Sequence, residues 1–179
     1  MTWQTLGRGM RRLTLILALF FPILAHAAAF SEYELKAAFV YNFASFTDWP
    51  SKAAPGMSVC VIGQDPFGRA LDALEGKAVK GQSLSVRRLS TIAEARTCRV
   101  LFISASEVNN LPRLLAAVKD LPVLTVSDMD DAAHQGVIIG LAIEKQRITF
   151  EINAAAARNA NIVLSSRLLN LARNVYPRP

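Results

Sequence analysis

The side chains that could carry out chemistry in this 179-residue chain are few and widely spaced. Asp128, Asp130 and Asp131 precede His134 in one short segment, where carboxylate oxygens could bind a divalent cation. The sequence favours a more ordinary interpretation, an acidic first turn that complements a helix dipole. Because His134 is the only histidine after residue 27, a metal centre built on several imidazoles is excluded. We therefore assign no metal ligand.

Motifs of familiar catalytic sites do not occur either. The apolar segment 57–63, rich in β-branched residues, predicts the first buried strand of an α/β sheet. Gly63 and Gly68 enclose residues 64–67, a spacing that matches neither the dinucleotide-binding fingerprint nor the P-loop. No G-x-S-x-G nucleophile elbow is present. The sequence thus predicts a protein that is not an enzyme and that has no cofactor.

The first 27 residues have the order of a secretory signal peptide. Three arginines precede the apolar run 13–24, and Ala25, His26 and Ala27 form an A-x-A cleavage site. The apolar run is short for a membrane span, although an uncleaved anchor is an alternative and a cut after Ala29 is equally compatible. We expect cleavage to leave residues 28–179 as an exported domain.

The charge of the chain gives little reason to expect nucleic-acid binding. There are 20 basic and 14 acidic residues, a net charge of +6. Arg8, Arg11 and Arg12 leave with the signal peptide, so 17 basic residues remain against 14 acidic ones and the net charge falls to +3. No long run of like charges is left, and we expect no nucleic acid among the partners. The remaining length suits one domain with its own core.

Cys60 and Cys98 are the two cysteines of the chain, and an even number in an exported protein first suggests a disulfide. Cys60 lies in the first predicted strand, and Cys98 immediately precedes the apolar segment 99–104. Strand one often lies beside strand three in a doubly wound sheet, which would bring the sulfurs within bonding distance. Two buried free thiols are the alternative. A thiol-redox enzyme is a weaker one, because the spacing is far from that of a C-x-x-C motif.

A helix is predicted over residues 31–49 from its apolar spacing and its two ends. Ser31 is a candidate N-cap with Glu34 at the capping-box spacing, and Trp49 followed by Pro50 ends the helix. The stripe expected in the core consists of Leu35, Phe39, Phe43 and Phe46. The opposite face, expected to point outward, holds Glu34, Tyr41, Ser45 and Asp48.

The rest of the chain alternates between strands and helices. Strands are predicted at 57–63, 84–89, 100–104 and 122–126, with helices at 66–75 and 110–119. The strand at 84–89 has mixed faces and is expected at a sheet edge. Segments 136–143 and 148–152 flank a polar turn and must pair antiparallel. The fold class is therefore α/β: a single Rossmann-like three-layer domain with a mostly parallel sheet and a C-terminal antiparallel hairpin.

Three further caps are predicted from polar residues that precede apolar periodic segments. Asp65 is expected to cap the helix at 66–75, and Asn153 an alanine-rich helix that runs through Arg158. Ser165 is expected to cap a last helix with a core face of Leu164, Leu168, Leu171 and Val175.

Several segments of the chain together match the pattern of one known family. They are KAAFVYNFASF at 36–46 with Trp49 and Pro50, CVIG at 60–63, DPFG at 65–68, Cys98 before LFI at 101–103, PVLTV at 122–126, RITFEIN at 147–153 and SSRLLNLA at 165–172. In these segments the chain resembles the YfiR-like periplasmic proteins. The resemblance is interrupted where Gln135 and Gly136 replace a glycine pair and where Ala132 and Ala133 replace an aromatic residue. Since loops carry specificity, this difference bears on which partner is recognised.

The resemblance implies a regulator. YfiR-like proteins bind the periplasmic sensor domain of an inner-membrane diguanylate cyclase and hold it inactive, which lowers cyclic di-GMP and biofilm formation. An OmpA-like outer-membrane lipoprotein can sequester them, and family members can form homodimers. The resemblance also implies that Cys60 and Cys98 are the recurrent cysteine pair of the family. We therefore expect a periplasmic repressor of a membrane-bound cyclase, within a single domain at 28–179.

Tyr41, Asp48 and Glu151 are the candidate contact residues for this cyclase. The first two lie on the polar face of the helix at 31–49, and the third lies on the hairpin. Ordinary solvent-exposed surface is an equal alternative for each of them. A second hypothesis is a periplasmic small-molecule or redox-sensing binding protein, with its ligand at the strand carboxyl ends near residues 63–67 and Asp128.

Overall fold

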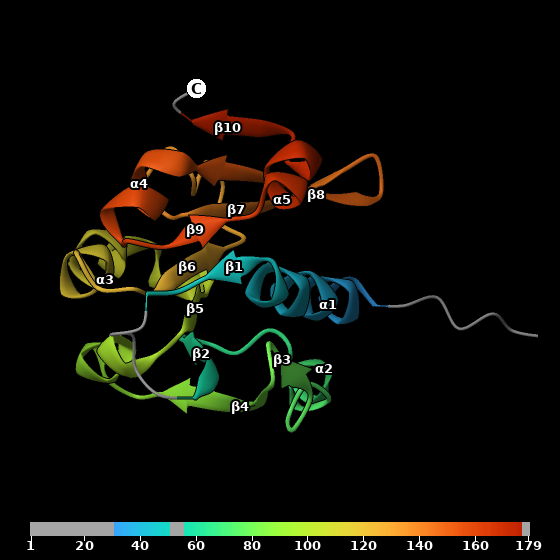
Figure 1. Cartoon of the computed structure of the whole chain (residues 1–179), viewed down its shortest axis with the longest axis vertical. Coiled ribbons are helices and arrows are strands. Elements are labelled where there is room, and N and C mark those ends of the chain that lie inside the picture. The colour runs from blue at the N-terminus through green and yellow to red at the C-terminus, as the bar shows by residue number, and fades with distance from the viewer. Residues whose placement is uncertain (1–30, 51–55, 177–179) are drawn as a thin grey trace, which may run out of the picture.

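The computed structural model describes residues 31–50 and 56–176, so the predicted signal peptide at 1–27 lies outside the described residues. One sheet of eight strands runs through the domain in the order β10-β8-β7-β6-β5-β2-β4-β3 (Figure 1). Neighbouring parallel strands are β4 (Gln82–Leu89), β2 (Met57–Ile62), β5 (Val100–Ile103), β6 (Leu124–Ser127) and β7 (Ile139–Glu144). The predicted α/β class and the mostly parallel sheet are confirmed.

The predicted C-terminal hairpin is also confirmed. β8 (Arg147–Asn153) pairs antiparallel with β7 from Glu144↔Arg147 to Ile139↔Ile152. The turn consists of Lys145 at φ 47° and Gln146 at φ 64°, the left-handed conformation that a two-residue hairpin turn requires.

Each edge of the sheet carries a short strand that was not expected from the sequence. β10 (Asn174–Tyr176) pairs in parallel with β8 at one edge. β3 (Ala78–Val79) pairs antiparallel with β4 at the other edge. β4 is therefore the outermost long strand, and only its first residues are covered by β3.

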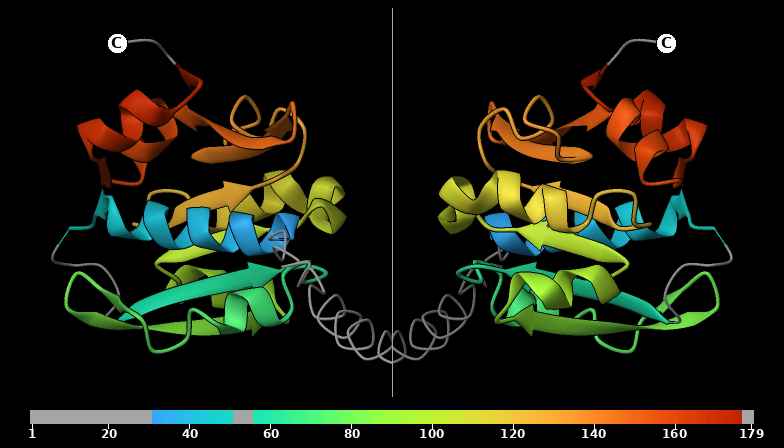
Figure 2. Two further views of the ribbon diagram at one scale, coloured as in Figure 1. Left: turned by 90° about the vertical axis from the view of Figure 1, so that its right-hand side faces the viewer. Right: turned by 90° about the vertical axis from the view of Figure 1, so that its left-hand side faces the viewer.

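Helices cover both faces of the sheet, as predicted for three layers (Figure 2). One face carries α1 (Glu32–Ser45), α2 (Arg69–Asp72), α4 (Ala154–Asn159) and α5 (Ser166–Leu171). The other face carries η1 (Ile92–Thr97), η2 (Ala105–Asn110) and α3 (Leu111–Ala117). β5 shows the alternation: Phe102 is buried in the core under α1, whereas Leu101 is buried in the core under α3. Among the described residues, no helix combines the length and the apolarity needed to cross a bilayer.

The start of α1 is as predicted, and its buried face is so in part: of the predicted stripe, Phe43 is buried and Phe39 and Phe46 pack against the core. Ser31 and Glu34 form the capping box, with each side chain accepting a hydrogen bond from the backbone N–H of the other. The buried residues are Lys36, Ala37, Val40, Phe43 and Ala44. Leu35, predicted in the core, is 41% exposed. The helix is thus rotated so that small residues approach the sheet and a lysine enters the core.

The helix at 31–49 also ends earlier than predicted. β1 (Thr47–Asp48) follows α1 and pairs antiparallel with β9 (Val163–Leu164), forming a small second sheet. The backbone N–H of Ser165 donates to the carbonyl of Phe46 at 2.9 Å. The far end of α1 is therefore attached to a segment more than a hundred residues later in the chain.

Two predicted helices are shorter in the structure. Asp65 does not cap α2: its Oδ1 accepts a hydrogen bond from the N–H of Phe67 at 2.8 Å, which turns the chain before the helix begins at Arg69. α5 begins after Ser165 as predicted but stops at Leu171, and Val175 lies in β10. Pairing with β8 satisfies backbone groups of β10 that the predicted longer helix would have satisfied internally.

Candidate functional site

The two cysteines are joined, as the sequence favoured. Cys60 and Cys98 form a disulfide with their Cα atoms 6.1 Å apart, a usual separation for this bond. Cys60 lies in β2 beside Leu101 of β5, and Cys98 stands two residues before β5 begins. Both are buried in the core under α3, with exposed fractions of 0% and 2%. The position is that of a structural cross-link. Neither cysteine is a free thiol, so the alternative of two buried free thiols is wrong.

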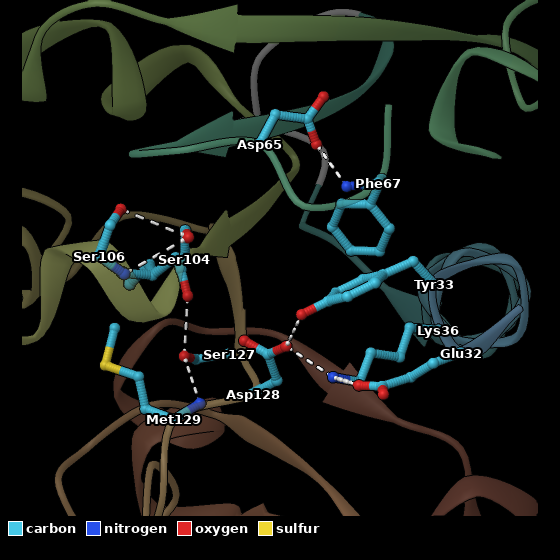
Figure 3. Close-up of polar contacts among 11 residues, drawn as sticks. Glu32, Tyr33, Lys36, Asp65, Phe67, Ser104, Ser106, Ser127, Asp128 and Met129 are labelled. Carbon is cyan, nitrogen blue, oxygen red and sulfur yellow. Dashed lines mark hydrogen bonds and ion pairs between the residues drawn. The ribbon is translucent and has the colours of Figure 1, made fainter. Parts of the chain in front are cut away.

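A buried ion pair occupies the carboxyl edge of the sheet, where α/β proteins commonly hold ligands. Asp128 follows β6, and Lys36 of α1 donates to its Oδ2 at 2.6 Å while the hydroxyl of Tyr33 donates at 3.3 Å (Figure 3). The ammonium group of Lys36 also lies 2.5 Å from a carboxylate oxygen of Glu32. The side chains of Lys36 and Asp128 are only 5% and 7% exposed. The first turns of α1 thus fill this part of the edge.

The environment of the ion pair shifts the pKa of two groups. Burial on its own would lower the pKa of Lys36, but its hydrogen bonds to Asp128 and Glu32 outweigh that effect and the pKa is raised. The pKa of Tyr33 is raised as well, first by burial and then by the negative charge of Asp128. Both shifts favour the protonated side chains, a lysine ammonium and a neutral tyrosine, in the folded protein.

This pair could not be foreseen from the sequence. Lys36 belongs to neither predicted face of the helix at 31–49, and Asp128 was predicted to lie at the start of a helix. The signal available was a lysine four residues after Glu32 and adjacent to the small residue Ala37, within an otherwise apolar helix. Its partner lies 92 residues away in the sequence, and only the packing of α1 across the sheet brings the two together.

The crevice between β2 and β5 is filled too. The chain runs from β2 to β4 on one side and then to β5 on the other, so this is the point where a doubly wound sheet opens. Gly63 follows β2 with φ +90°, and a Cβ placed on it would lie 2.5 Å from Ser106 Oγ and 2.7 Å from Glu107 Cγ. The N–H of Gln64 donates to Ser106 Oγ at 2.9 Å. The loop after β5 therefore closes directly onto Gly63, which does not favour the small-molecule hypothesis at residues 63–67.

Replacing Gly63 by alanine is expected to lower the free energy of unfolding by about 1–3 kcal/mol, since the change combines a left-handed backbone with a steric conflict. Gly76 is the matched control, because its φ is +76° but a Cβ there meets nothing within 4 Å. Urea unfolding of G63A and G76A should show the larger loss for G63A. Equal losses would mean that the close approach of Ser106 contributes nothing.

The segment with Asp128, Asp130, Asp131 and His134 is a series of turns in the structure, so the predicted acidic helix start is wrong. Asp131 has φ +53°, a left-handed conformation that stops a helix from forming there. The imidazole of His134 lies against the ring of Tyr176, with 4.0 Å between centroids. Within residues 31–50 and 56–176, no three His, Cys, Asp or Glu side chains are arranged to hold a metal ion.

The three candidate contact residues lie in different environments. Tyr41 is half-buried, and its hydroxyl donates to the carbonyl of Ala78 in β3 at 2.9 Å. Asp48 projects from β1 with its side chain 65% exposed and forms an ion pair with Lys80. Glu151 is 7% exposed. The structure therefore brings Tyr41 and Asp48 to one side of the molecule, beside β3, and places Glu151 elsewhere.

Glu151 has an internal role that the alternation of β8 did not reveal. Its Oε1 accepts hydrogen bonds from Arg173 Nε at 3.1 Å and from Asn174 Nδ2 at 2.9 Å. The hydroxyl of Tyr176 also donates to it, at 3.3 Å. The expected outward position of Glu151 is thus corrected: its carboxylate fastens the β10 segment to β8.

A groove runs between α1 and α2 next to Tyr41. Its walls are mostly apolar and include Leu35, Ala38 and Leu74, while Arg69 and Lys77 add two cationic side chains to the lining. The cavity has a volume of about 490 Å³. With Tyr41 and with Asp48 of β1, this groove forms one surface on the side of α1 that faces α2.

These observations define a disulfide-linked α/β domain of Rossmann-like topology, with the carboxyl end of β2 closed by the loop after β5 and a surface along its first helix. The chain belongs to the YfiR/HmsC-like family, whose model matches residues 33–173. The family resemblance seen in the sequence is thereby confirmed.

Solved structures share the fold at low sequence identity. A conserved domain protein from Vibrio cholerae O1 biovar El Tor has a TM-score of 0.55 and 12% identity, over 81% of this chain and 60% of that one. The ABC domain in complex with L-Trp from Streptococcus pneumoniae has a TM-score of 0.50 and 8% identity, over 76% of this chain and 60% of that one. The chain matches 60% of the length of each structure, and the likeness concerns the fold alone.

Proposed function

We propose that this protein is a periplasmic regulator that binds and represses an inner-membrane diguanylate cyclase, and so lowers cyclic di-GMP and biofilm formation. The observation that carries the proposal is the match of the YfiR/HmsC-like family over residues 33–173, which includes all described helices apart from the first residue of α1 and all described strands except β10. Members of this family act as regulators. The repression takes place by direct contact between the domain and the periplasmic part of the cyclase.

The disulfide supports the proposed compartment. A bond between Cys60 and Cys98 forms and persists in an oxidising environment such as the bacterial periplasm. It is buried in the core and stands away from the surface formed by Tyr41, Asp48 and the groove between α1 and α2. A stable scaffold with a separate contact surface is the arrangement that a repressor acting by contact requires.

Three partners belong to the proposal. The periplasmic domain of the cyclase is the target, and Asp48 with the adjacent Tyr41 is its contact on this chain. An OmpA-like outer-membrane lipoprotein sequesters the regulator and thereby releases the cyclase. The regulator itself acts as a homodimer.

Deletion of the gene is expected to raise cyclic di-GMP and surface attachment severalfold. The unaltered gene on a plasmid should return both to the level of the parent strain. A gene that encodes the D48K variant should leave both at the raised level, because charge reversal in a contact surface places like charges opposite each other. Cyclic di-GMP is measured by mass spectrometry of cell extracts and attachment by crystal violet staining.

The chain offers a matched control for D48K. Asp48 pairs with Lys80 in the folded protein, so D48K alone also breaks an internal ion pair. The double variant D48K/K80D restores that pair with its polarity reversed. If the partner contacts the charge at position 48, the double variant remains unable to repress the cyclase. If the double variant regains full repression, position 48 has no contact role. Unchanged cyclic di-GMP in the deletion strain would contradict the function itself.

A further inference from the structure

The β7–β8 hairpin extends beyond the rest of the sheet and leaves a strand edge open (Figure 1). β7 pairs with β6 only at Val126↔Ile139 and Ser127↔Gly140. Its pairing with β8 continues for four more residues, to Glu144↔Arg147. Among the described residues, the stretch 141–144 therefore has a neighbouring strand on one side only.

The backbone groups on the open side can be assigned from the turn. In a two-residue hairpin the flanking pair, here Glu144 and Arg147, exchanges both ladder hydrogen bonds, and bonded and non-bonded pairs then alternate. Ala142 and Glu144 thus direct their N–H and C=O groups toward β8. Leu141 and Ile143 direct theirs away from β8, to the side that β6 no longer covers. An extended peptide could pair with these groups in the way that β6 pairs with β7 at Ile139 and Gly140.

A cleft lies along this open edge. It is formed by the turns 128–132 on one side and by β7 residues 140–143 on the other, with Glu151 and Arg173 also in its lining, and its volume is about 590 Å³. Ile143 is 48% exposed at its outer end. The cleft thus occupies the place into which β6 would continue if it were longer. The partly exposed side chain of Ile143 lies next to it.

The charge of the cleft is negative. Four carboxylates line it, and Arg173 is its one cation. Arg173 is already bound to Glu144 and Glu151, and Asp128 is bound to Lys36. Asp130 and Asp131 are exposed and have no ion-pair partner in the part of the chain that the structure describes. A segment that enters the cleft would therefore meet two uncompensated carboxylates.

We propose that the β7 edge binds an extended segment of another protein that adds a strand beside residues 141–144, with basic side chains facing Asp130 and Asp131 and an apolar side chain against Ile143. Strand addition to an open edge gives affinity through main-chain hydrogen bonds and specificity through alternate side chains. A second copy of this chain fits less well, because the same carboxylates and Glu144 would face each other. The inference does not depend on the proposed cyclase.

The test uses two labelled, end-capped peptides of eight residues, one alternating valine and lysine and the other alternating valine and glutamate. Fluorescence polarisation with the purified chain at low salt should give at least tenfold tighter binding for the lysine peptide. The preference should decrease as salt is added, since exposed charges are screened. Equal binding of the two peptides would overturn the proposal.

The variant I143P removes one N–H that points into the cleft and no bond of the β7–β8 ladder. This variant should lower the affinity for the lysine peptide at least tenfold. I148P is the matched control: Ile148 lies opposite Ile143 in a non-bonded pair, so its N–H points to the other edge of the hairpin. It should change the affinity less than twofold. An unchanged affinity in I143P would refute strand addition.

A second variant keeps the test decisive if I143P does not fold, which circular dichroism would show. D130N/D131N alters only exposed side chains and should reduce the preference for the lysine peptide to less than threefold. A preference that remains tenfold in this variant would contradict the assigned role of the two carboxylates. A dimer in sedimentation that becomes a monomer in I143P, with no peptide bound, would assign the edge to a second copy and overturn the proposal.

Discussion

A chain in which Cys60 and Cys98 are both replaced by alanine is expected to have a free energy of unfolding about 3–4 kcal/mol below that of the oxidised protein, from the entropy of closing a loop of this length. The cross-link spans 38 positions and restricts the unfolded chain far more than the folded one, where β2 and β5 already lie side by side. For a domain of this size the loss corresponds to a fall of roughly 10 °C in melting temperature. Urea unfolding with and without dithiothreitol measures it.

The reduced unaltered protein is the control for this prediction. It lacks the bond but keeps both sulfurs in the core, so it separates the cross-link from the packing lost with alanine. We expect reduction alone to account for most of the loss, and the double variant to be insensitive to dithiothreitol. If oxidised and reduced protein unfold at the same urea concentration, the bond does not contribute to stability.

The second large effect is expected at the ion pair between α1 and the loop after β6. K36M removes the cation and leaves the carboxylate of Asp128 buried, with the hydroxyl of Tyr33 as its remaining side-chain donor. Breaking one partner of a buried pair typically lowers the free energy of unfolding by about 3–5 kcal/mol. The double variant K36M/D128L replaces both charges by apolar groups and should recover most of the loss, as measured by urea unfolding. A double variant as unstable as K36M would show that packing, and not the unpaired charge, causes the effect.

The pH dependence of stability gives an independent check on the same pair. The pKa of Lys36 is raised in the folded protein above its ordinary value of 10.5, so its contribution is complete below about pH 10.5 and is lost as the pH rises through the folded-state pKa. Tyr33, whose pKa is also raised, acts in the same direction, because its ionisation is easier in the unfolded chain. The unaltered protein should lose stability steeply above pH 10.5, and K36M should show a shallower decline.

Local signals in the sequence were sufficient for the features that depend on neighbouring residues. The capping box of Ser31 and Glu34, the cap at Asn153 and the hairpin with its polar turn follow from residue types at short spacing. The disulfide needed one further assumption, that the first strand lies beside the third, and this is a general property of doubly wound sheets.

The features that could not be predicted depend on contacts between distant segments. Glu151 alternates as an outward residue of β8, but β10 returns to that strand and buries its carboxylate. Leu35 matches a helical apolar stripe, yet α1 packs through Ala37 and Val40 and leaves it exposed. Helical periodicity indicates that one face is buried, while the angle at which the helix meets the sheet decides which face it is.

The first helix is fixed at both of its ends. Lys36 attaches one end to Asp128, and at the other end Phe46 and Thr47 are bound to the segment around β9. A partner that binds along Tyr41 and Asp48 therefore meets a rigid support whose conformational entropy was already given up during folding. Little of the binding free energy is then lost to ordering this chain, so even a contact of modest area can be tight.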